Sequence, residues 1–211
     1  MPPSFQACCA HDHDCEAEEC SGSWSLVKHI DIQRVRCLNE AEPGSCRTVF
    51  RPWHLRLTPP NHPLTTLRSN PDDPELLLHV PFTGSIKLQA ITVIGGPKGR
   101  SPAKLKVYTN KDNLDFSSVN DLTPVQEWDL VENLNGVMEY PTNVAKFNGV
   151  HSIDLFFPAN FGADDTEITF VGFKGEFSER RRQAVEAVYE ARPVPQDHKV
   201  PGENQGANWG L

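Results

Sequence analysis

The sequence predicts an all-β protein, and three observations lead to that prediction. Glycine and proline are abundant, with 14 and 18 of the 211 residues, whereas methionine occurs only twice. This composition favours short strands joined by turns over a helical bundle. Short segments with strand-like patterns follow one another between residues 76 and 173, separated by turn-forming residues. Strands do not alternate with helices and there is no internal repeat, so we expect an antiparallel sandwich or jelly roll.

The N-terminal region, residues 1–23, is expected to form a tail. It contains hardly any large apolar side chain that could offset the entropy of ordering. The segment that follows fits two patterns. Leu26, Ile30 and Ile32 could share one face of a strand, or a short helical turn could begin after Asp31. Both interpretations place the segment against the core.

Residues 39–74 are punctuated by prolines, and we predict a long irregular connection there. Its expected apolar anchors are Phe50, Trp53 and Leu64.

The clearest strand signals follow this connection. Residues 76–80 form a short apolar run, and residues 85–94 alternate before they become apolar on both faces, as in a central strand. We expect a turn at Thr83 and Gly84 between the two. Further strands are predicted at residues 104–108, around Trp128 and Leu130, at residues 150–157 and at residues 167–173.

The C-terminal part is ambiguous. Residues 178–191 could form a helix capped by Ser178, but alternate residues from Val185 to Ala191 also fit one face of a strand, which the all-β context favours. Residues 193–211 contain three prolines, three glycines and few apolar groups. We predict a flexible C-terminal tail.

Charge and hydropathy exclude some functions. The formal net charge of −8 argues against a dedicated nucleic-acid-binding protein. No stretch approaches the roughly 20 apolar residues of a membrane span, and the N-terminus lacks the features of a secretory signal. We therefore expect no membrane partner and an intracellular protein, cytoplasmic and also compatible with the nucleus. The six cysteines are expected to be reduced there.

Five segments, in this order and spacing, resemble the PITH domain, a proteasome-interacting module that also occurs behind a thioredoxin domain in thioredoxin-like proteins. The resemblance covers about residues 24–192, and the stand-alone PITH-domain proteins fit best. The segments are Cys37–Glu40, Ser69–Leu77, Pro81–Leu88, Asn160–Asp164 and Phe170–Glu176.

This resemblance implies a jelly-roll β-sandwich similar to galactose-binding domains. It also implies protein association without established catalytic residues, with the proteasome regulatory particle as the partner. The chain departs from the common family pattern at Asn70, where aspartate is frequent, and at Pro71 and Pro74.

The N-terminal tail is a candidate metal site. Thiolate and imidazole groups are good ligands for zinc and copper, and this span is short enough to wrap one ion. The spacing matches no standard zinc finger, so an unstructured polar tail is the alternative. The candidate ligands are Cys8, Cys9, His11, His13, Cys15 and Cys20.

Other patterns argue against an enzyme. The chain has no Cys-x-x-Cys motif for thiol chemistry, and Cys37 is expected to be a buried structural thiol. His151 and Ser152 are adjacent in a predicted strand and would point to opposite faces, so they cannot act as a dyad. The acids of Asp72–Glu75 and Asp164–Glu167 lack the spacing of a calcium loop and are predicted to be solvated.

The expected function is therefore a non-enzymatic interaction module that is monomeric alone. Competing hypotheses are a binder of carbohydrate or another small ligand, for which Trp53 and Trp128 are the candidate aromatic platforms, and a metal-binding accessory protein. The candidate partner-binding residues lie near and in the C-terminal tail, as a basic run, a histidine and an aromatic anchor. They are Arg180, Arg181, Arg182, His198 and Trp209.

Overall fold

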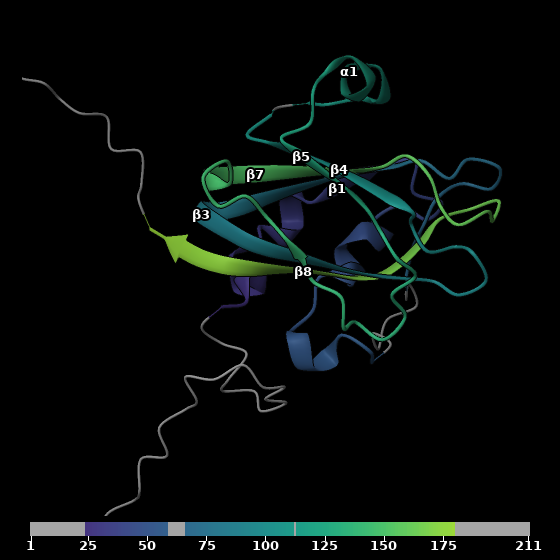
Figure 1. Ribbon diagram of the computed structural model, residues 1–211, viewed down its shortest axis with the longest axis horizontal. Helices are drawn as coiled ribbons and strands as arrows, with labels where there is room; N and C mark the ends of the chain where they lie inside the picture. Colours follow the sequence, from purple (N-terminus) through teal and green to yellow (C-terminus); the bar gives the residue numbers. More distant parts are fainter. Residues whose placement is uncertain (1–23, 59–65, 112, 180–211) are drawn as a thin grey trace, which may run out of the picture. The chain divides into compact units, whose positions relative to one another are not determined.

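The computed structural model describes residues 24–58, 66–111 and 113–179, which form a β-sandwich in which every paired strand is antiparallel (Figure 1). The strands are β1 (Arg36–Leu38), β2 (Leu67–Arg68), β3 (Leu76–Gly95), β4 (Lys104–Thr109), β5 (Gln126–Asp129), β6 (Tyr140–Pro141), β7 (Asn148–Phe157) and β8 (Glu167–Ser178). The helices are the 3-10 turns η2 (Leu26–His29), η3 (Ile32–Arg34), η4 (Ser45–Val49) and η5 (Trp53–Leu55), and the α-helix α1 (Phe116–Asp121). The all-β prediction is confirmed.

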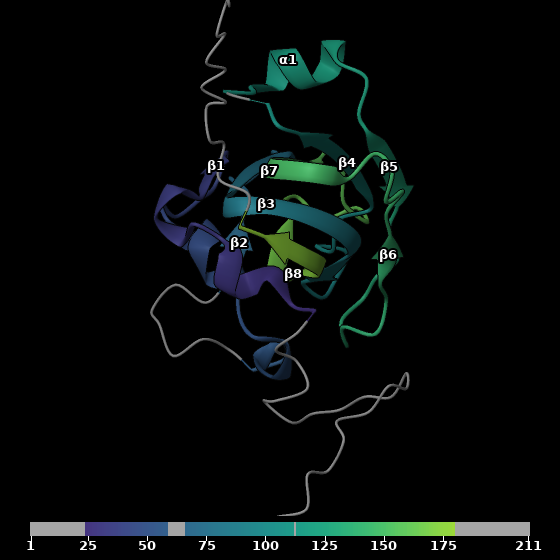
Figure 2. The ribbon, with the colours of Figure 1, turned by 90° about the vertical axis from the view of Figure 1, so that its left-hand side faces the viewer.

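Strand β3 is the central element and joins the two halves of the sandwich. Its first part lies between β1 and β7, and its second part lies between β8 and β6. Figure 2 shows β3 between β7 on one side and β8 on the other. Along the main hydrogen-bonded path the strand order is β2-β8-β3-β7-β4-β5.

The turn predicted at Thr83 and Gly84 is wrong, because β3 runs through it without interruption. The pairing with β7 shifts register between Pro81 and Ile86, so the extra residues form a bulge and the strand changes partners there. A bulge uses the same residue types as a turn but keeps the chain extended, which explains the error.

The other strand predictions are confirmed with small changes at their ends. Strand β7 begins two residues before the predicted start at Val150, and β8 continues five residues beyond Phe173 to Ser178. Strand β5 ends at Asp129, so Leu130 follows it as a buried residue. The strand expected at residues 185–191 and both predicted tails lie outside the described residues.

The main core lies between the two halves of the sandwich. On β7, Ile153, Leu155 and Phe157 point into it and are fully buried. Phe156 points the other way, into a second cluster with Leu77, Tyr108 and Val119. Val119 belongs to α1, which covers this outer face (Figure 2). The alternation therefore buries both faces of β7.

The sequence patterns did not predict α1. It is six residues long, and its N-cap Asp115 accepts a hydrogen bond from the Ser118 amide. The helix is anchored by Tyr108, whose hydroxyl donates to the Val119 carbonyl oxygen at 2.8 Å. Packing against a sheet therefore stabilises a helix that would be too short to form alone.

Between Trp24 and β1 the strand interpretation is wrong. The chain instead forms η2 and η3, and the second turn begins after Asp31, as the alternative predicted. Leu26 and Ile30 are both buried, so the segment does pack against the core. Within residues 39–74 the described chain is mostly irregular, with Phe50 buried and Trp53 partly buried, while Leu64 lies outside the described residues.

No helix in the described residues is long and apolar enough to cross a membrane.

Candidate interaction site

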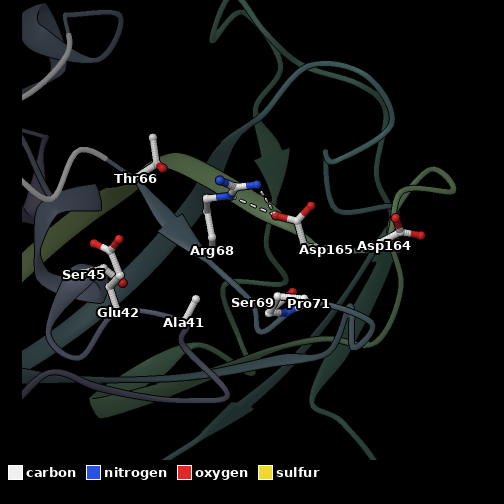
Figure 3. A pocket seen from close by; sticks show the side chains of 9 residues that line it. All are labelled: Ala41, Glu42, Ser45, Thr66, Arg68, Ser69, Pro71, Asp164 and Asp165. Carbon is white, nitrogen blue, oxygen red and sulfur yellow. Dashed lines mark hydrogen bonds and ion pairs between the residues drawn. The ribbon is translucent and has the colours of Figure 1, made fainter.

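Three of the motif segments meet where β1 ends and where β3 and β8 begin. Backbone pairing joins Glu40 to Ser69. The Thr166 amide donates to the Ser69 hydroxyl, and the Ser69 amide donates to the Thr166 carbonyl oxygen, both at 2.9 Å. A pocket of about 430 Å³ opens between these segments (Figure 3). It is lined by Ala41, Glu42, Ser45, Thr66, Arg68, Ser69, Pro71, Asp164 and Asp165.

Asn39 organises the acidic turn on one side of the pocket. It has a left-handed backbone with φ of 69°, which asparagine tolerates better than most residues. Its side-chain amide donates to the carbonyl oxygens of Asp73 at 3.3 Å and Glu75 at 2.7 Å, and its Oδ1 accepts from Asn70 at 2.8 Å. An ionised aspartate at position 70 could not donate this last bond, so the family departure at Asn70 has a structural role here.

Glu40 holds the opposite wall. Its carboxylate accepts hydrogen bonds from the Gly44 amide at 2.8 Å, the Cys46 amide at 3.1 Å and the Ser45 hydroxyl at 3.3 Å. The carboxylate thereby satisfies amides at the start of η4, where the turn itself provides no acceptors.

Asp165 is the electrostatic centre of the site. Arg68 donates to its Oδ2 from Nη2 at 2.7 Å and from Nε at 2.9 Å, and Nε of Arg100 lies 3.0 Å from its Oδ1. Arg100 also lies 3.5 Å from Glu167. The prediction that these acids are solvated turn residues is therefore wrong for Asp165, which is 9% exposed and paired with two arginines.

The site is polar and is held together by hydrogen bonds and ion pairs. Its floor is held rigidly, because Thr166 is fully buried and its hydroxyl donates to the Pro74 carbonyl oxygen at 2.7 Å. Its rim presents Glu42, Asn70 and Asp164 to solvent. In the described part of the chain no group of three or more His, Cys, Asp or Glu residues could hold a metal ion.

Arg68 and Arg100 were not among the residues predicted from the sequence. Each lies in a segment without a motif, and nothing in either segment identifies its partner. Asp165 is 97 residues from Arg68 along the chain. The fold alone brings the pair together.

The other candidates from the sequence lie apart from this pocket. Trp128 packs against the main core, and Trp53 contacts Trp24 and Phe170 at 5.4 Å and 6.0 Å between ring centroids. The lining of the pocket in Figure 3, as far as the structure describes it, includes no aromatic side chain that could serve as a sugar platform.

Three of the described histidines, His29, His79 and His151, lie on or beside the sheet. The His29 ring stacks on Phe177 at 3.6 Å between centroids. Nδ1 of His79 lies 2.7 Å from Oδ1 of Asp154, inside the sheet. His151 and Ser152 are neighbours on β7, as predicted.

The two described cysteines are free thiols with raised pKa values. Cys46 is buried and Cys37 is partly buried, and neither forms a disulfide. Burial raises the pKa of Cys37, with the nearby Cys46 and Glu40 adding to the shift. Burial, together with the Glu40 charge, also raises the pKa of Cys46, to about 12. Neither thiol has the low pKa of a catalytic cysteine.

The predicted partner-binding residues Arg180, Arg181, Arg182, His198 and Trp209 lie outside the described residues. The same is true of the candidate metal ligands Cys8, Cys9, His11, His13, Cys15 and Cys20. Their roles remain predictions.

Several proteins of known structure share the fold at low sequence identity. A tandem CBM32 structure from Clostridium perfringens ZmpB, in complex with GalNAc, aligns with a TM-score of 0.52 and 12% identity, covering 72% of this chain and 36% of that one. The family 32 carbohydrate-binding module of NanJ from the same organism, in complex with galactose, aligns with a TM-score of 0.50 and 12% identity, covering 72% and 98%. At this identity the likeness shows the jelly-roll fold alone.

Curated relatives are similar over most of their length. PITH domain-containing protein 1 of Dictyostelium discoideum is 39% identical over 176 residues, which cover 83% of this chain and 85% of that protein. The human protein of the same name is 34% identical over 193 residues, covering 91% and 89%. Neither name identifies an enzyme. The PITH domain profile matches residues 16–193. By this match and these relatives, the chain belongs to the PITH domain family.

Proposed function

We propose that this protein is a non-enzymatic interaction module of the cytoplasm or nucleus that binds the proteasome regulatory particle, or a related large assembly, and modulates it. The observation that carries the proposal is membership of the PITH domain family across residues 16–193, since the family fits a protein-interaction role. The rigid polar site around Asp165 supports it, because a preorganised surface loses little entropy on binding.

The proposed contacts to the assembly come from the C-terminal part of the chain. Arg180, Arg181 and Arg182 form a basic run in a chain of net charge −8, which would orient the encounter with an acidic surface. Trp209 would serve as an aromatic anchor, with His198 as a hydrogen-bonding group. No bound metal or other cofactor is needed for this role.

The test is binding of the full chain to purified proteasome regulatory particle, followed in real time. We expect deletion of residues 193–211 to weaken binding at least tenfold, which is about 1.4 kcal/mol. We expect replacement of the three arginines by glutamate to slow association and to reduce its dependence on salt, because the long-range attraction is lost.

A matched control replaces Lys28, Arg34 and Lys111 by glutamate. These three residues are exposed in the structure, and the substitution changes the net charge by the same amount. Unchanged binding after both C-terminal alterations would place the contact elsewhere on the sandwich. Absence of binding by the intact chain would contradict the proposed partner.

A further inference from the structure

A second pocket, of about 460 Å³, shares Thr66 with the first but is otherwise lined by different residues. Its walls come from residues on both sides of η5, from the end of β3 and from the start of β8. It is lined by Arg51, Arg56, Leu57, Thr58, Thr66, Ile94, Gly95, Pro97, Leu134 and Thr169.

The guanidinium group of Arg51 is only partly satisfied by the protein. Its Nη2 donates to the carbonyl oxygens of Thr169 at 2.9 Å and Arg56 at 3.1 Å. Its Nε and Nη1 are buried and have no hydrogen-bond acceptor. Burial lowers the pKa of Arg51. A buried cation with unmade hydrogen bonds is costly, so this side chain would be stabilised by a nearby negative charge.

Arg56 adds a second cation to the same pocket. Its guanidinium lies over the Trp53 ring at 4.5 Å from the centroid, and its Nη1 donates to the Trp53 carbonyl oxygen at 3.3 Å. Its Nε is also buried without an acceptor. Gly136 packs closely here, since a Cβ at that position would lie 3.2 Å from both Cδ and Nε of Arg56. The side chain is therefore held in place.

The protein supplies no described counter-charge to this pair. Within the described residues, the carboxylates that form ion pairs do so with other basic side chains, and neither Arg51 nor Arg56 is among them. Residues 59–65, which connect two lining residues, contain no aspartate or glutamate. Two positive charges thus lie beside one pocket without a negative one, in contrast to the neutralised arginines around Asp165.

The rim of the pocket is apolar and open to solvent. Leu57 is 56% exposed and Leu134 is 45% exposed, and Val137 in the same loop as Leu134 is 76% exposed. An exposed apolar rim beside a charged centre is typical of a surface that binds another protein. A small inorganic anion or a nucleic-acid backbone would leave these side chains uncovered.

We propose that this pocket binds the carboxylate of an acidic segment of a partner protein, and that apolar neighbours of that carboxylate cover Leu57 and Leu134. The inference rests on the proposed interaction role and specifies the chemistry of one contact. The arginines provide charge complementarity, and the leucines provide the apolar area that favours a protein segment.

The test uses the full chain and an acetylated, amidated peptide of alternating leucine and glutamate. The Nε–H signals of Arg51 and Arg56 are followed by nuclear magnetic resonance during titration. We expect both signals to shift with the acidic peptide. A peptide in which glutamine replaces glutamate, and inorganic phosphate alone, should bind at least tenfold more weakly.

Leu134→Glu is the decisive variant, because it places a carboxylate in the pocket at an exposed position that should not disturb folding. We expect it to weaken peptide binding at least tenfold by competing for the arginines. Val137→Glu adds the same charge in the same loop outside the pocket lining and should bind normally. Arg56→Gln provides a second variant, with an expected loss of at least tenfold.

The inference is overturned if the arginine signals do not shift, if the glutamine peptide or phosphate binds as well as the acidic peptide, or if Leu134→Glu binds like Val137→Glu. Its failure is separate from that of the proposed function. If the regulatory particle still binds the Leu134→Glu variant normally, the role of this pocket is refuted and the proposed function is not. Peptide binding without particle binding would refute the proposed partner alone.

Discussion

Asp115 shows how one side chain organises a local structure. Its Oδ1 accepts hydrogen bonds from the Ser118 amide at 2.7 Å, the Ser118 hydroxyl at 2.6 Å and the Ser117 hydroxyl at 2.8 Å. These bonds lower the pKa of Asp115 to about 2, with the Ser118 side chain contributing most. The carboxylate therefore caps α1 in its ionised form.

We expect Asp115→Ala to lower the Tm at neutral pH by about 2–4 °C, the effect of a lost N-cap in a domain of this size. Since the folded pKa lies below the unfolded value of 3.8, the contribution is present above pH 4 and is lost as the pH falls toward 2. Thermal melts from pH 7 to pH 2 measure this. Asp121→Ala is the control for removing a charge from α1. If the difference in Tm between wild type and Asp115→Ala stayed constant down to pH 2, the ionised Asp115 carboxylate would not be the cap of α1.

The described thiols give a second prediction at this scale. With its pKa raised to about 12 from 9.0, Cys46 has roughly a thousandfold less thiolate than an exposed cysteine at the same pH. We expect Cys46 and Cys37 to resist iodoacetamide at pH 8 in the native protein and to react once it is unfolded. Peptide mapping by mass spectrometry distinguishes them from the other cysteines. Rapid native labelling of Cys46 would refute this expectation.

At the scale of elements, the pairing of β3 with β8 depends on close backbone approach. The register shifts between Leu88 and Ala90, opposite Gly175 and Lys174. A Cβ at Gly175 would collide with the Lys87 carbonyl oxygen and lie 3.1 Å from the Leu88 Cα. Because these are backbone atoms of the central strand, only glycine fits at this point of the bulge.

Gly175→Ala should therefore destabilise the protein by about 3 kcal/mol, near the upper end for overpacking. The matched control is Gly84→Ala on the same strand pair, where the new Cβ would mainly meet the ring end of the partly buried Phe177. That ring can shift, so we expect a loss of about 1 kcal/mol. Urea denaturation measures both. Equal losses of stability in the two variants would show that the close backbone approach at Gly175 does not limit the pairing of β3 with β8.

At the scale of the whole molecule, Trp24 marks where the described chain joins the sandwich. Its carbonyl oxygen accepts from the Gly175 amide at 2.9 Å, and its ring lies 5.2 Å from Nζ of Lys174. It also packs against Trp53. Within the described residues, the contacts that tie this end of the chain to β8 thus start at Trp24.

Deletion of residues 1–23 should accordingly leave the Tm within about 4 °C of the full chain, a change of roughly 1 kcal/mol or less. A chelator should not change the Tm of the full chain or of the deletion variant. Differential scanning calorimetry with and without EDTA makes the comparison. A large loss on deletion that EDTA reproduces in the full chain would instead indicate a structural metal site at the N-terminal cysteines and histidines.

Prediction from the sequence succeeded where a local pattern carries the information. Residues 104–108, 150–157 and 167–173 alternate or are apolar in runs, and each forms a strand. It failed at Thr83 and Gly84, because a turn and a bulge use the same residue types. It missed α1, because six residues give too short a pattern and the helix depends on Tyr108 and Phe156 beneath it.

For the sites, the family motifs identified the segments but not their chemistry. The amide of Asn70, the carboxylate of Glu40 and the doubly paired Asp165 hold those segments together. Arg68 and Arg100 were not predicted, because an ion pair between distant residues leaves no local pattern.

The sequence alone determined the fold class and the order of most strands, because alternation and turn residues act over a few neighbouring positions. The family was indicated by the resemblance of its motif segments. Only the tertiary structure decided that β3 serves both halves of the sandwich, and that the arginines near Asp165 are neutralised while Arg51 and Arg56 are not. The physical reason is that pairing and burial depend on contacts between residues far apart in the chain, which form only when the whole sandwich closes.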